Sequence, residues 1–147
     1  MRAQALAMLT LILLGIVTPA TGANDERYGY ITVQDLSVQL RNDTAFIKVN
    51  YTVDEGTRII FFLLGKQDLK NKLYRILDYD DAQMRRIDLE SAEFSVKGAA
   101  YSYGKGIYWF PSHQFNIVIP SLTVQSPQVT RTFYMTSAFP DGIGYFD

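Results

Sequence analysis

Two neighbouring segments with apolar residues at every second position most constrain what this chain can fold into. In segment 45–53 the odd-numbered residues are all apolar: Ala45, Ile47, Val49, Tyr51 and Val53. Segment 30–40 ends on the same alternation, and the polar residues 41–44 lie between the two. A period of two places successive side chains on opposite faces of a strand. The two segments therefore predict a β-hairpin, joined by a four-residue turn, with one face buried and the other in water.

Residues 1–23 have the layout of a secretory signal peptide. Arg2 gives a positive start, residues 5–17 carry no charge and are largely apolar, and small residues lead up to Ala23. This order is typical of an export signal that is removed. The apolar run is shorter than the roughly 20 residues that a membrane-spanning helix needs. We therefore predict a signal peptide over 1–23 and a secreted chain over 24–147, with an uncut membrane anchor as the alternative.

The composition fits one β-rich domain without disulfides. The chain has no cysteine, so burial of apolar side chains and hydrogen bonding must stabilise it without disulfides. Fourteen Lys and Arg residues nearly balance 15 Asp and Glu, for a net charge of −1, which gives no attraction to nucleic acid. Ten tyrosines and nine phenylalanines favour strands. We expect residues 24–147 to form a single domain.

Two apolar segments in the middle of the chain predict different elements. Residues 59–64 are six consecutive apolar residues, which predicts an interior strand covered on both faces. Residues 67–78 predict an amphipathic helix, because four apolar residues recur at the spacing of one helical face: Leu69, Leu73, Ile76 and Leu77. Segment 84–89 fits either a strand or a short helical turn.

The spacing of turns beyond the helix predicts the fold class. Gly and Pro residues divide the second half of the chain into short segments of alternating or aromatic residues. Turns at such intervals are typical of a β-sandwich. The sequence thus predicts a mostly-β fold, a sandwich of about seven antiparallel strands with one inserted helix at residues 67–78. A single small sheet with the helix on one side is the alternative.

An aromatic band surrounds residues 104–106, which predict the tip of a hairpin. In a strand, Tyr108 and Phe110 share one face, whereas Ile107 and Trp109 share the other. One set is expected in the core, and an exposed set would mark a binding surface. Packing between neighbouring strands is the alternative explanation. The candidate ligand-binding residues are Tyr101, Tyr103, Tyr108 and Trp109.

Two Asn-x-Thr tripeptides are candidate glycosylation sites. They are Asn42-Asp43-Thr44, in the predicted turn, and Asn50-Tyr51-Thr52, with Asn50 on the predicted wet face of its strand. Attachment of a glycan requires a surface asparagine in an exported chain. We therefore expect Asn42 and Asn50 to be accessible, although such tripeptides also arise by chance.

The titratable residues form no pattern typical of catalysis. His113 is the single histidine, and no Gly-x-Ser-x-Gly motif is present. A cluster of three aspartates lacks the ligand spacing of an EF-hand: Asp78, Asp80 and Asp81. The glycines of segment 104–106 lack the remainder of a phosphate-binding loop. We predict no catalytic residue, no metal site and no cofactor.

Segments 59–77, 81–111 and 139–146 are similar to small secreted archaeal proteins of unassigned function. The resemblance is compatible with export and transfers no site residues. The sequence predicts a non-catalytic extracellular or envelope-associated domain acting in recognition or surface assembly. Its expected partner is a protein or glycan at the cell surface. The alternatives are a carbohydrate-binding module that uses exposed Tyr and Trp rings, and a small secreted hydrolase that uses the clustered aspartates.

Overall fold

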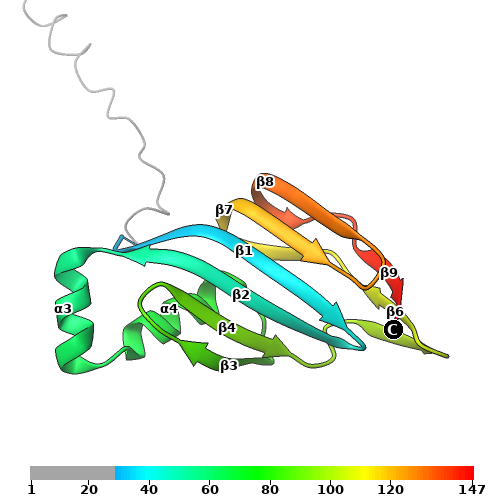
Figure 1. The fold of residues 1–147 in the computed structure, drawn as a ribbon, viewed down its shortest axis with the longest axis horizontal. Helices are drawn as coiled ribbons and strands as arrows, with labels where there is room; N and C mark the ends of the chain where they lie inside the picture. The colour runs from blue at the N-terminus through cyan, green and yellow to red at the C-terminus, as the bar shows by residue number, and fades with distance from the viewer. Residues whose placement is uncertain (1–28) are drawn as a thin grey trace, which may run out of the picture.

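The computed structural model describes residues 29–147, which form nine strands and two helices in two layers (Figure 1). The strands are β1 (Ile31–Arg41), β2 (Thr44–Val53), β3 (Ala82–Ile87), β4 (Ser91–Val96), β5 (Tyr101–Gly104), β6 (Ile107–Phe110), β7 (His113–Gln125), β8 (Thr130–Phe139) and β9 (Ile143–Phe146). The helices are α3 (Glu55–Leu64) and α4 (Gln67–Leu77). The predicted signal peptide, residues 1–23, lies outside the described residues.

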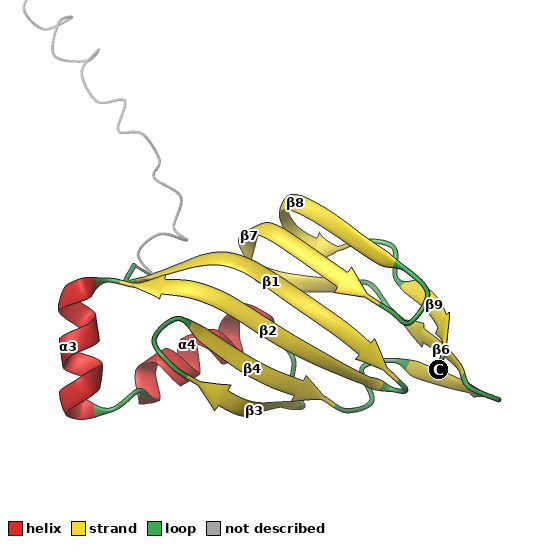
Figure 2. Cartoon of the chain, in the orientation of Figure 1, coloured by secondary structure: helices red, strands yellow, loops and turns green. Residues whose placement is uncertain are grey.

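A six-stranded sheet of order β3-β4-β2-β1-β7-β8 forms one layer. The second layer covers one face of that sheet, with α4 toward one end and the small sheet β5-β6-β9 toward the other (Figure 2). The side chains that face this second layer form one continuous core. The opposite face of the large sheet remains in water, as the exposed Lys48 and the half-buried Ser37 show. The mostly-β fold predicted from the sequence is confirmed.

The β1–β2 hairpin matches its prediction. Val38 pairs with Ile47 in antiparallel register, and both side chains are buried on the core face. The turn is shorter than predicted, because β1 continues to Arg41 and β2 begins at Thr44. Asn42 takes a left-handed conformation (φ 48°), which asparagine tolerates better than most residues and which a two-residue hairpin turn favours.

Helix α4 confirms the amphipathic helix predicted over residues 67–78. Its four apolar side chains are completely buried: Leu69, Leu73, Ile76 and Leu77. Tyr74 adds an edge-to-face contact with Phe94 of β4, with ring centroids 5.4 Å apart. The helix ends at Asp78, which adopts a left-handed conformation (φ 55°). The helical spacing of apolar residues was therefore a sufficient signal.

The prediction of an interior strand at residues 59–64 is wrong, because these residues belong to helix α3. The Asp54 side chain accepts a hydrogen bond from the Thr57 N–H (3.3 Å) and caps the helix start, and Gly65 (φ 88°) ends it. Phe61 is the one buried residue of α3. The sheet position beside β2, where the segment would follow directly as a strand, is occupied by β4. Neither helix within residues 29–147 is long and apolar enough to cross a membrane.

The sandwich of about seven antiparallel strands is not confirmed. Within residues 29–147 nine strands form, and β1 and β7 pair in parallel. The second sheet has three short strands, because α4 occupies much of the face that a full second sheet would cover. The alternative, one sheet with the helix on one side, is nearer to this arrangement. Segment 84–89, left open by the sequence, lies mainly in strand β3.

Candidate functional site

One face of the small sheet β5-β6-β9 is exposed and strongly aromatic. The strand register places Trp109 between Tyr101 on β5 and Gly144 on β9, and it pairs Ile107 with Phe146. We call the exposed side chains on this side the aromatic face: Tyr101, Tyr103, Ile107, Trp109 and Phe146. Their exposed fractions run from 39% for Ile107 to 70% for Tyr103. The face forms a shallow depression over β6 and β9.

The ring of Trp109 lies across two glycines, Gly142 just before β9 and Gly144 within β9. A Cβ added to Gly142 would lie 2.7 Å from Cζ2 of the indole ring, and one added to Gly144 would lie 3.5 Å from Cε3. The ring therefore rests on glycine backbone, where any side chain at 142 would displace it. Since 40% of Trp109 is exposed, the ring offers a surface to solvent. A ring supported in this way is held in place before any ligand arrives.

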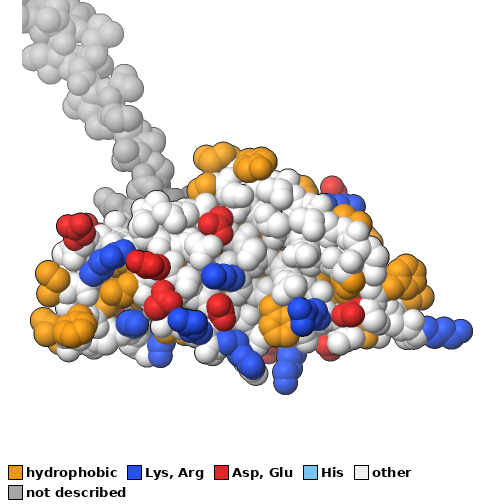
Figure 3. All heavy atoms as spheres, in the orientation of Figure 1, with side chains coloured by type: hydrophobic (Ala, Val, Ile, Leu, Met, Phe, Trp, Pro, Cys, Tyr) orange, Lys and Arg blue, Asp and Glu red, His pale blue; other side chains and the backbone are white. Residues whose placement is uncertain are grey.

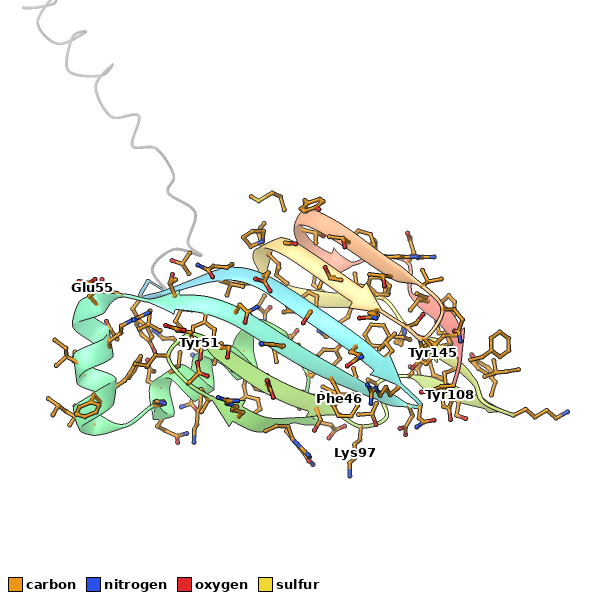
Figure 4. The ribbon with its side chains drawn as sticks, in the orientation of Figure 1. Phe46, Tyr51, Glu55, Lys97, Tyr108 and Tyr145 are labelled. Carbon is orange, nitrogen blue, oxygen red and sulfur yellow. The ribbon has the colours of Figure 1, made fainter. Side chains whose placement is uncertain are left out.

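Tyr108 points to the opposite side of the small sheet and does not join the aromatic face. Its ring stacks on that of Tyr145, with centroids 5.6 Å apart and planes 22° apart. Its hydroxyl donates to Oδ1 of Asn42 (3.5 Å), so the ring points back toward the β1–β2 turn (Figure 4). Of the four predicted ligand-binding residues, Tyr101, Tyr103 and Trp109 lie on one side of the small sheet, and the ring of Tyr108 lies on the other, although Tyr108 also lines the shallow depression.

Ile107 and Phe146 belong to the aromatic face but were not among the predicted site residues. The alternation along β6 already placed Ile107 on the same side as Trp109, so that signal was present in the sequence. Phe146 could not be found in this way, because its pairing with Ile107 joins segments that are far apart in the chain. Its position depends on the tertiary structure.

Hydrogen bonds around Asn42 fix the small sheet to the large one. The Tyr145 hydroxyl donates to the backbone carbonyl of Asn42 (2.6 Å), and the N–H of Asn42 donates to the Asp147 carboxylate. Burial, with the nearby carboxylates of Asp147 and Asp43, raises the pKa of Tyr145 to about 12. The phenol therefore stays protonated and keeps donating at any ordinary pH. These contacts hold the aromatic face at a fixed orientation.

The two candidate glycosylation sites differ in accessibility. Asn42 is exposed at the β1–β2 turn, as expected. Asn50 is half-buried on the open face of the large sheet, and its Nδ2 donates to Oδ1 of Asp35 (2.8 Å). Because a glycan is attached through Nδ2, modification of Asn50 would require this hydrogen bond to break. Glycosylation at either residue stays a prediction.

His113 connects α4 to the large sheet. Its Nε2 lies 2.7 Å from the carbonyl oxygen of Leu77, so Nε2 carries the proton of the neutral ring. The ring stacks on Tyr79, with centroids 3.7 Å apart and planes 5° apart. Burial lowers the pKa of His113. These contacts account for the histidine as a packing residue that joins two elements.

The acidic cluster after α4 is spread over the surface. Asp78 ends the helix, and the other two aspartates, Asp80 and Asp81, are also exposed. Within residues 29–147, no three His, Cys, Asp or Glu side chains come together as metal ligands would. The predictions on catalysis, metals and cofactors stay predictions.

Comparisons with protein-family models, with curated proteins and with solved structures find no match to this chain. Similarity to small secreted archaeal proteins, and secretion itself, thus remain predictions from the sequence. The aromatic face is the part of the molecular surface on which the exposed sequence candidates converge.

Proposed function

We propose that this protein is a non-catalytic domain of the cell exterior that recognises a partner protein through the aromatic face. The observation that carries the proposal is that five large apolar side chains gather, exposed, on one side of one small sheet. Contiguous exposed apolar surface is uncommon on proteins that bind nothing. Trp and Tyr side chains are also favoured anchors of protein interfaces.

The edge strand β5 adds a second means of binding. Within residues 29–147, β5 pairs with β6 on one side and with no strand on the other. A partner strand could extend the sheet here through backbone hydrogen bonds. Its side chains would then meet Tyr101 and Tyr103, which stand on β5 itself. The same edge would serve assembly of this domain into a larger surface structure.

The rigidity of the aromatic face favours binding. Trp109 rests on glycine backbone, and the small sheet is tied to the β1–β2 turn by Tyr145. Side chains that are already ordered lose less conformational entropy when a partner binds, and this loss costs about 0.5–1.5 kcal/mol for each mobile side chain. This arrangement supports recognition by a preformed surface.

A glycan is the second candidate ligand, and the orientation of Trp109 favours it. An indole ring supported on one side by glycines leaves a flat apolar surface on which a sugar ring could stack. The aromatic face itself offers few hydrogen-bonding groups besides the two tyrosine hydroxyls, and sugars need several. A protein partner is therefore the preferred candidate. The hydrolase alternative gains no support from the exposed aspartates after α4.

The test measures binding of the purified protein to cell envelopes from the organism that makes it. Replacing both Tyr101 and Tyr103 by Ser should weaken saturable binding at least about tenfold, as truncation of anchor residues does. Both side chains are at least 60% exposed, so the variant should fold normally. Tyr134→Ser is the matched control, because Tyr134 is 73% exposed on the other sheet.

Pretreatment of the envelopes distinguishes the two ligand classes. Protease treatment should abolish the difference in binding between the wild type and the double variant if the partner is a protein, whereas periodate oxidation should abolish this difference if the partner is a glycan. Equal binding by the wild type and the double variant would rule out the aromatic face as the binding surface.

A further inference from the structure

Helix α3 carries a second exposed apolar surface, at the end of the molecule away from the aromatic face (Figure 1). Five of its side chains are exposed by 52% to 85%: Ile59, Ile60, Phe62, Leu63 and Leu64. Figure 3 shows apolar side chains gathered at this end. We call these five residues the α3 ridge. Nothing in the proposed recognition function uses it.

The α3 ridge is broad. At about 100° per residue, its five side chains cover an arc of about 200° around the helix axis. The remaining arc holds Phe61, whose ring packs edge-on against Tyr30 with centroids 5.3 Å apart. Helix α3 is thus attached to the body of the protein along a narrow line, and most of its circumference is apolar and in contact with solvent.

We propose that α3 inserts into the interfacial region of a lipid bilayer and attaches the protein to the membrane surface. A second copy of the chain fits less well, because helix packing covers a stripe little more than about 100° wide and would leave much of the ridge in water. A fluid bilayer adapts to a convex ridge and covers all of it. Such helices lie in the plane of the interface with their apolar side buried.

The start of the described fold lies beside α3. The described fold begins at Gly29, and the backbone oxygen of Tyr30 accepts a hydrogen bond from the N–H of Asp54, the residue that caps α3 (3.0 Å). The chain before Gly29 includes the apolar run of residues 5–17. If that run is held in a membrane during export, the chain enters the domain beside the start of α3. The inference holds whether the run is later removed or kept.

The charges around α3 suit the surface of a bilayer. Segment 54–77, which covers both α3 and α4, contains five basic residues against three acidic ones, and the excess comes from α4. Arg58 lies within α3, and Lys66 directly follows Gly65 at its end. Lysine and arginine can bury their apolar stems and keep their charged ends among lipid headgroups. The small excess of positive charge should strengthen binding to anionic lipids without being required for it.

A fluorescent label on α3 tests the proposal in the full chain. The chain has no cysteine, so Leu63→Cys gives a single attachment point for the environment-sensitive fluorophore NBD. We expect phosphatidylcholine vesicles to cause a several-fold rise in emission and a shift to shorter wavelength. Vesicles that also contain phosphatidylglycerol should bind more tightly. Lipids with a nitroxide on the acyl chain should quench the signal.

Two further variants control the experiment. The same label at Tyr134→Cys should show no change, because Tyr134 is exposed on β8, outside α3. Adding Phe62→Ser to Leu63→Cys should weaken the affinity for vesicles at least about tenfold, the loss expected when one large apolar contact is removed. Phe62 is 85% exposed, so this change should not affect folding.

Three outcomes would overturn the proposal. If the N-terminal run alone holds the chain on vesicles, the label at 63 stays in water while the protein co-floats with lipid. If a second copy covers the ridge, emission rises with protein concentration in the absence of lipid. If the N-terminal run covers it, the label is protected at every concentration. The vesicles contain no protein and no glycan, so none of these outcomes depends on the aromatic face. In the envelope test, any binding of α3 to lipid is the same in the wild type and in the Tyr101 and Tyr103 double variant, so the difference between them reports the aromatic face alone.

Discussion

At the level of single residues, the position of Trp109 depends on what its neighbours lack. Gly142 (φ 67°) leaves room for the indole ring, and a Cβ there would lie 2.7 Å from Cζ2 of the indole and 2.8 Å from the Phe110 carbonyl oxygen. Gly98 has nearly the same backbone angle (φ 69°) but open space around it. Comparing these two glycines separates the cost of the backbone conformation from the cost of displacing the ring.

We predict that Gly142→Ala destabilises the protein more than Gly98→Ala does. In both variants the left-handed backbone conformation of the new alanine should lower the free energy of unfolding by about 1–2 kcal/mol. Gly142→Ala should lower the free energy of unfolding by about 1–3 kcal/mol more, because its Cβ meets a ring and a carbonyl group that cannot both move. Urea unfolding measures the difference, and emission of Trp109, the single tryptophan, should change in Gly142→Ala alone. Equal losses in the two variants would contradict the packing of Trp109 on Gly142.

At the level of elements, α3 and α4 show how much a pattern of apolar residues can decide. In α4 the apolar residues recur at helical spacing, and polar residues between them exclude a strand. In α3 six apolar residues follow one another, and such a run fits a strand and a helix alike. Its helical state depends on the cap at Asp54, the left-handed Gly65 and the lack of an open position beside β2. The occupied position beside β2 is a property of the sheet, and the residues of α3 themselves do not show it.

We predict that Leu73→Ala lowers the free energy of unfolding by about 2–5 kcal/mol, the range for a buried leucine that leaves a cavity. Leu73 is completely buried beneath the large sheet. Asn71→Ala on the same helix is the control, because Asn71 is exposed and should change stability by less than about 0.5 kcal/mol. Chemical denaturation measures both, and similar effects would show that α4 is not packed on the sheet.

At the level of the whole molecule, the two exposed apolar surfaces lie at opposite ends of the long axis (Figure 1). If α3 rests in a bilayer, the aromatic face lies at the far end of the domain from it. The large sheet runs between the two ends, and its continuous core makes it a stiff spacer. Attachment at one end and recognition at the other are therefore compatible in a single domain.

Global stability should depend on the charge of His113. Burial lowers the pKa of His113 below its ordinary value of 6.5, so the unfolded chain binds a proton more readily than the folded one. Its contribution to stability is therefore fully present above pH 6.5 and declines as the pH falls below that value. We expect a lower urea midpoint at pH 5.5 than at pH 7.5.

His113→Gln is the control for this pH dependence. Glutamine keeps a donor that can reach toward the Leu77 carbonyl but does not titrate, and the chain has no other histidine. In the variant, the urea midpoints at pH 5.5 and pH 7.5 should differ much less than in the wild type. A pH dependence as large as that of the wild type would show that another group is responsible.

What the sequence by itself determined is the set of elements with a clear period: the β1–β2 hairpin, helix α4 and the turn at residues 104–106. The period of the apolar residues indicates that one side of a helix or strand is buried, and this is a local property. The tertiary structure alone decided which other element packs against that side. It placed Trp109 rather than Tyr108 outward, brought Phe146 beside Ile107, paired β1 with β7 in parallel, and left α3 outside the sheet. These outcomes depend on contacts between distant segments, which compete for the same positions on one sheet and which no local pattern of residues records.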